Sequence, residues 1–140
     1  SAAKHIYKRV ISGGASMVES IYNMVLEDNE DIMKSLGAFF AENGITYGFF
    51  VSGSGTMKDV ELVYTEPNHG ISKNLFREEM RIKAVSGQIE RGKDGEINYQ
   101  LNVSVIGDAS GSKAGQLVSG KAARTMKIGV RKVDIKKMMK

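Results

Sequence analysis

A glycine-rich segment near the C-terminal end of the chain has the spacing of a phosphate-binding loop. Residues 115–121 fit the pattern G-x-x-x-x-G-K, in which backbone N–H groups and the lysine hold the phosphates of a nucleotide. Ala122 stands where a serine or threonine would bind magnesium. The residues beyond it alternate like a strand, whereas the motif requires a helix. The sequence therefore argues against a nucleotide site at this segment.

A second candidate for phosphate chemistry is the run of small residues at 52–56, which ends an apolar, β-favouring stretch. The run is not a dinucleotide-binding fingerprint, because Lys58 replaces the last glycine of that pattern. The simplest interpretation is a tight turn in which glycine relieves backbone strain. The free N–H groups of such a turn can also hold an anion. The candidate ligand-binding residues of this loop are therefore Ser52, Gly53, Ser54, Gly55 and Thr56.

Side chains that carry acid–base or nucleophilic catalysis are sparse in this sequence. Neither of the two histidines, His5 and His69, lies in a pattern that would organise a general base. Glu78 and Glu79 are adjacent, so on a strand they would point to opposite faces. Cysteine is absent, which excludes disulfides and thiolate metal sites and is typical of cytoplasmic proteins. We therefore expect a cytoplasmic protein with no catalytic residues and no cofactor.

Basic residues are concentrated at the C-terminal end of the chain. Residues 121–140 contain eight lysines and arginines and one acidic residue, a net charge of +7, in a chain whose total charge is +4. Such a segment can attract a polyanion such as DNA, but it can equally be a solvated strand edge that discourages aggregation. If the strand is regular, alternate residues share one side. The candidate DNA-contacting residues are then Lys121, Lys127 and Arg131, extended by Lys136 and Lys137.

One long helix is expected between residues 28 and 44. Asp28 or Asn29 can cap its N-terminus, and Gly44 supplies the left-handed residue that commonly ends a helix. Between them, apolar residues recur at the spacing of one helical face. The residues of this predicted apolar face are Ile32, Leu36, Phe39 and Phe40.

The rest of the chain shows the pattern of β-strands separated by turns, with a flexible loop expected at residues 107–115. A chain of 140 residues argues for one domain, 1–140. No apolar run approaches 18 residues, so we expect no membrane partner. The pattern predicts an α+β fold, a mostly antiparallel sheet with one main helix packed on it. Strands are predicted at residues 5–11, 19–27, 45–52, 59–64, 79–86, 97–106 and 126–130.

The order of these segments resembles the plant- and prokaryote-conserved (PPC) domain, in the form that stands alone in prokaryotes. The likeness covers roughly residues 22–130 and leaves an N-terminal extra strand and the basic C-terminal tail outside it. It implies a PPC-like domain that assembles as a homotrimer, with DNA as the expected partner. The Arg-Gly-Arg-Pro core of the AT-hook, which plant members carry, is absent. The segments that carry the resemblance are Leu26–Ile32, Val51–Thr56 with Val60–Leu62, Val85–Gly87, and Gly115–Leu117 with Gly120.

The chain departs from this resemblance at three positions where many prokaryotic members place histidines. Those positions are occupied by Gln100, Asn102 and Gln116. In such members a His-x-His pair on one strand and a third histidine nearby would share a metal ion. Carboxamides are poor ligands for zinc-like ions, so the resemblance implies that no metal binds here. The amides would instead form hydrogen bonds in a polar pocket or across a subunit contact, or they are ordinary surface side chains.

Three hypotheses for the function follow from these patterns. The first is a non-catalytic homotrimer that binds DNA through sequence-independent contacts with phosphates. The second is a module that binds a small ligand in a polar pocket at or near a subunit interface, close to the three amides and the loop at 52–56. The third is a purely structural role in assembly.

Overall fold

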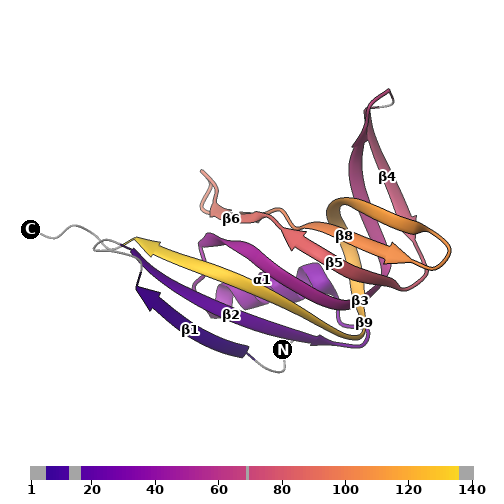
Figure 1. Cartoon of the computed structure of the whole chain (residues 1–140). Helices are drawn as coiled ribbons and strands as arrows, with labels where there is room; N and C mark the ends of the chain where they lie inside the picture. Colours follow the sequence, from indigo (N-terminus) through magenta and orange to yellow (C-terminus); the bar gives the residue numbers. More distant parts are fainter. Residues whose placement is uncertain (1–5, 13–16, 69, 136–140) are drawn as a thin grey trace, which may run out of the picture.

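The computed structural model describes residues 6–12, 17–68 and 70–135 as a strongly twisted antiparallel sheet with one helix on it (Figure 1). The predicted α+β class, a mostly antiparallel sheet with one main helix, is therefore confirmed. None of the described helices is long and apolar enough to cross a membrane. The elements are β1 (Ile6–Ser12), β2 (Met17–Glu27), α1 (Ile32–Glu42), β3 (Tyr47–Glu66), β4 (Gly70–Phe76), β5 (Met80–Ser86), β6 (Gln88–Arg91), β7 (Ile97–Tyr99), β8 (Asn102–Gly107) and β9 (Gly111–Ile135).

Two long strands, β3 and β9, organise the sheet by pairing with different neighbours along their length. The C-terminal half of β9 lies between β2 and β3, and its N-terminal part pairs with β8. Strand β8 pairs with β5, and β5 pairs with β3, so the four pairings form a closed circuit. The end of β3 pairs with β4, and this hairpin stands away from the body as an arm (Figure 1).

The N-cap of the helix lies three residues after one predicted cap and two residues after the other. Asp31 caps it, since its side chain accepts a hydrogen bond from the backbone N–H of Lys34 at 3.0 Å. Asp28 and Asn29 are not caps: Asn29 has a positive φ of 73° and Asp28 contacts β9. The predicted end is confirmed, because Gly44 has a φ of 62° and the N–H of Ile45 bonds to the carbonyl oxygen of Phe40.

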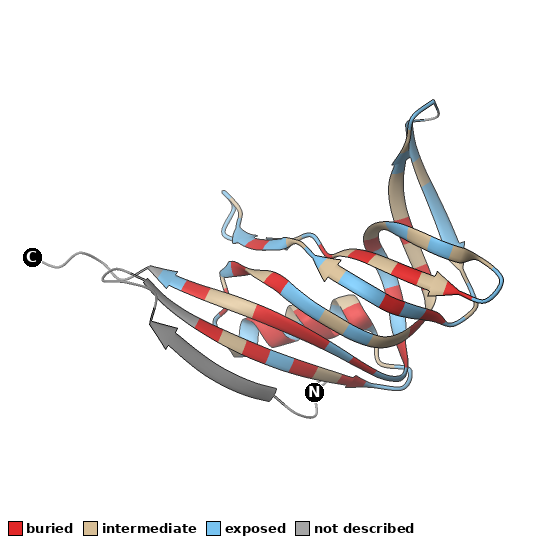
Figure 2. Cartoon of the chain, viewed as in Figure 1, coloured by how far each residue is buried: buried red, intermediate tan, exposed pale blue. Residues whose placement is uncertain are grey.

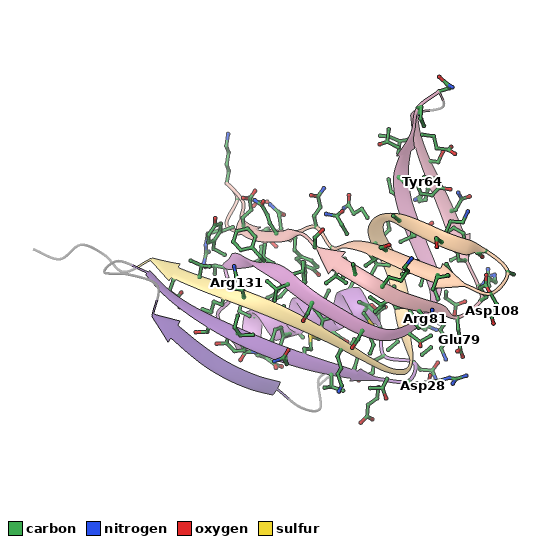
Figure 3. The ribbon with its side chains drawn as sticks, viewed as in Figure 1. Asp28, Tyr64, Glu79, Arg81, Asp108 and Arg131 are labelled. Carbon is green, nitrogen blue, oxygen red and sulfur yellow. The ribbon has the colours of Figure 1, made fainter. Side chains whose placement is uncertain are left out.

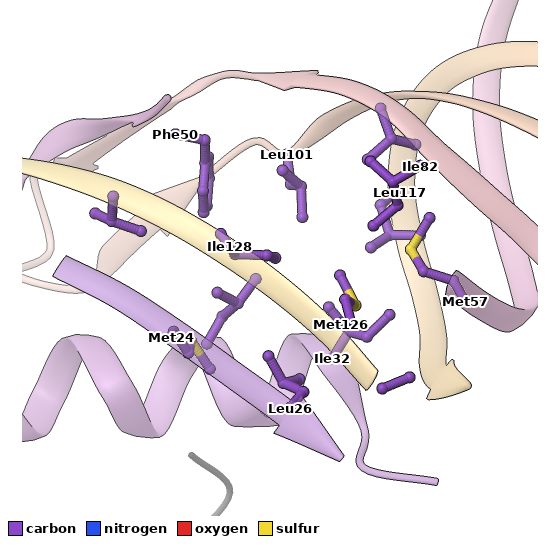
Figure 4. Packing of buried hydrophobic residues seen from close by; sticks show 14 of the residues in the cluster. Met24, Leu26, Ile32, Phe50, Met57, Ile82, Leu101, Leu117, Met126 and Ile128 are labelled. Atoms are coloured by element: carbon purple, nitrogen blue, oxygen red, sulfur yellow. The ribbon is translucent and has the colours of Figure 1, made fainter. Parts of the chain in front are cut away.

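The hydrophobic core lies between α1 and the sheet and continues into the closed circuit of strands (Figure 4). The predicted apolar face of the helix is confirmed, since all four of its residues are buried. Along β2, buried side chains alternate with exposed or half-buried ones (Figure 2), as expected when one sheet face packs on a helix. The residues packed here include Met24, Leu26, Met126, Ile128 and Val130.

The predicted turn at residues 52–56 is wrong, because β3 runs without a break through the whole segment. The strand stays continuous because its backbone pairs with β9, with Ser52 opposite Gly129 and Ser54 opposite Lys127. The small residues serve a bulge instead of a turn. Gly55 has a φ of 97°, and a Cβ atom there would lie 2.3 Å from the carbonyl oxygen of Thr125.

Other predictions also change in the structure: the strand predicted at 126–130 is part of the much longer β9, and β6 was not predicted. Residues 107–115 are not a flexible loop: 108–110 form the tight turn of the β8–β9 hairpin, and 111–115 already belong to β9. The strand predicted at 97–106 divides into β7 and β8, with two irregular residues between them. Strand β4 was not predicted, because it is exposed on both faces and has little apolar alternation.

Candidate functional site

The three carboxamides singled out in the sequence lie together in the structure. Asn102 and Gln116 are directly opposite each other in the β8–β9 ladder. Gln100 lies just before β8, and its side-chain amide donates a hydrogen bond to the side-chain oxygen of Gln116 at 3.3 Å. The antiparallel hairpin thus brings together residues that are 14 to 16 positions apart in the sequence. The amides form one polar cluster, partly exposed to solvent.

A groove of about 670 Å³ runs beside this cluster, in the corner between the β3–β4 arm and the outer face of β5, β8 and β9. Asn102 and Gln116 lie at its edge, and Tyr64 and Ile71 of the arm form its wall. Gln100 borders a separate depression of about 450 Å³ together with Gln88, Glu90, Asn98 and Tyr99. The floor of the groove is made of small side chains from three strands, among them Ala84, Ser86, Ser104 and Ala114.

The segment 52–56 does not belong to this groove. None of its residues lines either depression. Its residues lie on β3 opposite the C-terminal half of β9. Pairing in the sheet places this segment on β3 and the amides beside or within β8 and β9, so the two sets come from different strands.

Acidic and imidazole side chains do not gather at this site. Within residues 6–12, 17–68 and 70–135, no three His, Cys, Asp or Glu side chains are close enough together to hold a metal ion. His5 and His69 lie outside the described residues. The chemistry available at the groove is hydrogen bonding by neutral amides and hydroxyls, together with apolar contact.

The predicted basic residues are divided by an irregularity in β9. Lys127 and Arg131 lie on the face of the sheet away from α1, and Figure 3 shows Arg131 on this strand. Lys121 lies beyond a bulge at residues 124 and 125, where Arg124 has a φ of 66°. The strand is thus not regular, which was the condition for one shared side. Lys136 and Lys137 lie outside the described residues.

A cluster of charges around this bulge was not predicted from the sequence. Asp28 accepts a hydrogen bond from the backbone N–H of Arg124 at 2.7 Å and from the ammonium group of Lys58 at 3.2 Å. The hydrogen bond from the Arg124 backbone lowers the pKa of Asp28 most, and the hydrogen bond from Lys58 lowers it further. Arg124 also pairs with Glu79 at 3.4 Å, and both carboxylates lie near the same end of the sheet (Figure 3). Asp28 therefore stabilises the irregular part of β9.

A second carboxylate, Glu78, holds the turn between β8 and β9. Its two oxygens accept hydrogen bonds from the backbone N–H groups of Ala109 at 3.0 Å and Ser110 at 2.6 Å. The hydroxyl of Ser110 and these N–H groups lower the pKa of Glu78 below its ordinary value of 4.5. The turn that closes the hairpin of the amide cluster thus depends on a charged side chain that lies two residues before β5.

The lowered pKa of Glu78 predicts a dependence of stability on pH. A carboxyl group with a lower pKa in the folded state stabilises the fold above its unfolded pKa, and this contribution disappears as the pH falls through the folded pKa. We expect the urea midpoint to be steady above about pH 5.5 and to fall below about pH 4.5. Glu78→Gln should lower the midpoint at pH 7 and reduce its slope in acid. Equal acid slopes for the two proteins would contradict this prediction.

Comparison with protein families places most of the chain within one of them. Residues 14–134 match the model of the Plants and Prokaryotes Conserved (PCC) domain. This range extends a few residues beyond the likeness seen in the sequence. A search of the curated proteins found no match.

Several solved structures share this fold. One is a protein of Bacteroides thetaiotaomicron, described as a "putative DNA binding protein", which is 23% identical in sequence with a TM-score of 0.70. The match covers 89% of this chain and 83% of the Bacteroides protein. A plant- and prokaryote-conserved protein of Pyrococcus horikoshii is 18% identical with a TM-score of 0.71, covering 94% and 85%. A metal-containing protein of Archaeoglobus fulgidus is 18% identical with a TM-score of 0.72, covering 95% and 87%.

Proposed function

The chain belongs to the Plants and Prokaryotes Conserved (PCC) domain family, and on that premise we propose that it is a non-catalytic protein that binds DNA through the phosphate backbone. The observation that carries this proposal is the state of two lysines on β9. Lys121 and Lys127 are exposed, and neither forms an ion pair with another described residue. Both belong to the segment of net charge +7. Unpaired cations of this kind release counterions from DNA when they contact phosphates. The description of the Bacteroides relative supports the same partner.

Binding through phosphates predicts a dependence on salt and an indifference to base sequence. Two unrelated DNA duplexes should bind with dissociation constants within about threefold of each other, because phosphate contacts carry no sequence information. The double variant Lys121→Glu/Lys127→Glu should weaken binding at least about tenfold at low salt and reduce the slope of log K against log salt by about 2. Fluorescence anisotropy in a salt series measures both quantities.

The control for this experiment is Lys34→Glu/Lys93→Glu, which changes the net charge equally at exposed sites outside β9. It should retain most of the affinity. Equal losses in the two double variants would mean that only the net charge matters. The absence of any duplex complex at low salt would contradict the proposal itself.

Self-association as a homotrimer is the second part of the proposal. The arm supports it, because Ile71 and Leu75 of β4 are 77% and 46% exposed on an edge strand that has one partner within the described residues. Exposed apolar edge strands are normally covered. Sedimentation equilibrium should give three times the chain mass of 15.3 kDa, and Ile71→Ser/Leu75→Ser should shift it toward one chain. A single-chain mass for the unmodified protein would contradict this part.

A small-ligand module is the alternative that one specific observation favours. The groove of about 670 Å³ lies within the size range of ligand sites and carries Asn102 and Gln116 at its edge. A metabolite that binds there should raise the melting temperature of the unmodified protein but not of Asn102→Ala/Gln116→Ala. The Lys121→Glu/Lys127→Glu variant should respond like the unmodified protein. A thermal-shift screen without a response that depends on the two amides would remove this alternative.

A further inference from the structure

The face of β2, β9 and β3 that points away from α1 is open to solvent over the described residues. Exposed positions on it come from all three strands, including Asn23 of β2, Lys127 of β9 and Ser54 of β3. Figure 1 shows α1 behind these strands with no described element in front of them. Gly129, in the centre, presents no side chain, and a Cβ atom there would lie 2.2 Å from the hydroxyl oxygen of Ser52. Gly129 itself is buried, with the side chains of Ser52 and Asn23 beside it.

Two aromatic side chains lie on this open face at the start of β3. Tyr47 and Phe49 are two residues apart on the strand, and their rings pack edge to face with centroids 5.6 Å apart. Tyr47 is 39% exposed, and Phe49 is half-buried. Exposed aromatic rings on a sheet face offer an apolar surface on which a planar ligand can stack.

One cation on this face lies beside the aromatic pair, and a second lies farther along the same strand. Arg131 is opposite Phe49 in the β3–β9 ladder, and Lys127 follows on the same side of β9, roughly 13 Å along the strand. The carboxylate of Glu90 lies on the other side of the pair, since Glu90 is opposite Tyr47 on β6. Its oxygen accepts a hydrogen bond from the side chain of Gln88 at 2.9 Å. The aromatic pair thus has positive charge on the β9 side and a hydrogen-bonded acid on the β6 side.

Rings beside cations on an open sheet match the chemistry of unpaired nucleotides. The bases of a duplex are already stacked on one another, so their faces cannot reach a protein ring, whereas unpaired bases can stack on aromatic side chains while cations hold the phosphates. We propose that this face binds single-stranded nucleic acid, with a base on Tyr47 and phosphates on Arg131 and Lys127. The proposal rests on the proposed DNA function and names the form of the nucleic acid. A polyanion fits this face by charge, because the β9 residues on it belong to segment 121–140, which has a net charge of +7.

The test compares a labelled oligothymidylate with a duplex of the same length by fluorescence anisotropy. The unmodified protein should bind the single strand more tightly. Tyr47→Leu should weaken single-strand binding at least roughly fivefold, because stacking on one base is lost, and should leave duplex binding unchanged. Tyr47→Phe keeps the ring and should retain single-strand affinity. The melting temperatures of both variants verify folding, and sedimentation verifies the state of association.

Two groups of outcomes overturn the inference. Duplex binding that equals or exceeds single-strand binding, or equal affinities for Tyr47→Leu and Tyr47→Phe, refutes the stacking site while the proposed DNA function stands. A change of sedimenting mass in Tyr47→Leu without a change in affinity assigns the face to a second copy of the chain instead. No binding to either nucleic acid removes both the inference and the proposed function.

Discussion

Gly55→Ala should lower the free energy of unfolding by at least about 3 kcal/mol. Gly55 has a φ of 97°, a conformation that costs any residue with a Cβ atom energy. A Cβ atom there would also lie 2.3 Å from the carbonyl oxygen of Thr125 and 2.9 Å from the Cα of Met126. Both contacts are with the backbone of β9, so no side-chain rotation can relieve them. The change should therefore separate the two strands that organise the sheet.

The matched control is Gly95→Ala in the turn between β6 and β7. Gly95 has a similar φ of 86°, but no atom lies within 4 Å of the position of its Cβ. This change should lower the free energy of unfolding only by the penalty of a left-handed backbone conformation, about 1 to 2 kcal/mol. Urea denaturation of both variants isolates the contribution of the close approach between strands. Equal losses of stability would show that β3 and β9 are farther apart than the structure places them.

Phe40→Ala should lower the free energy of unfolding by about 3 to 5 kcal/mol. Phe40 is 2% exposed, and its ring packs against Phe39, Phe50 and Tyr99, with the Tyr99 centroid 4.9 Å away. Removing the ring leaves a cavity between α1, β3 and β7, which the rigid sheet can fill only in part. Tyr99 is held on its other side, because its hydroxyl donates a hydrogen bond to the carbonyl oxygen of Met33 at 2.9 Å.

Two further variants serve as comparisons for the loss of stability expected in Phe40→Ala. Phe40→Leu keeps most of the buried volume and should lose clearly less stability than Phe40→Ala. Lys34→Ala, on the exposed side of the same helix, should change stability by no more than about 0.5 kcal/mol. Thermal and urea denaturation measure all three. A loss for Phe40→Ala as small as that for Lys34→Ala would mean that α1 does not pack on the sheet as described.

The candidate site could be predicted in part from the sequence. The resemblance singled out three positions, two on one strand and the third nearby, that this chain fills with amides. In the structure these residues, Gln100, Asn102 and Gln116, do lie together. A polar pocket near the amides was one of the predicted alternatives, but which strands form the groove was not predicted. Part of its wall belongs to β4, whose exposed residues leave no periodic signal. Its floor consists of small side chains, and alanines and serines on strands form no motif that could be recognised in the sequence.

The contacts of Asp28 show why other parts were not predictable. A carboxylate before a helix is a common cap, and that was its expected role. In the structure it binds the N–H of Arg124, which is 96 residues away. No local pattern contains a contact of that separation, because it exists only after β2 and β9 have paired. Lys121, Lys127 and Arg131 were predicted to share a side for a regular strand, and the bulge at this same place lies between Lys121 and the other two.

The amino-acid pattern was sufficient for whatever depends on neighbours a few residues away. The apolar face of α1 and the end of the helix at Gly44 follow from the geometry of one helix. The alternation that buries Val103 and Val105 follows from the geometry of one strand. The extent of β3, the bulges and the open aromatic face depend on which strands lie side by side. Pairing converted the small residues at 52–56 from a turn into the centre of a strand, since backbone hydrogen bonds to a distant partner outweigh local turn preference.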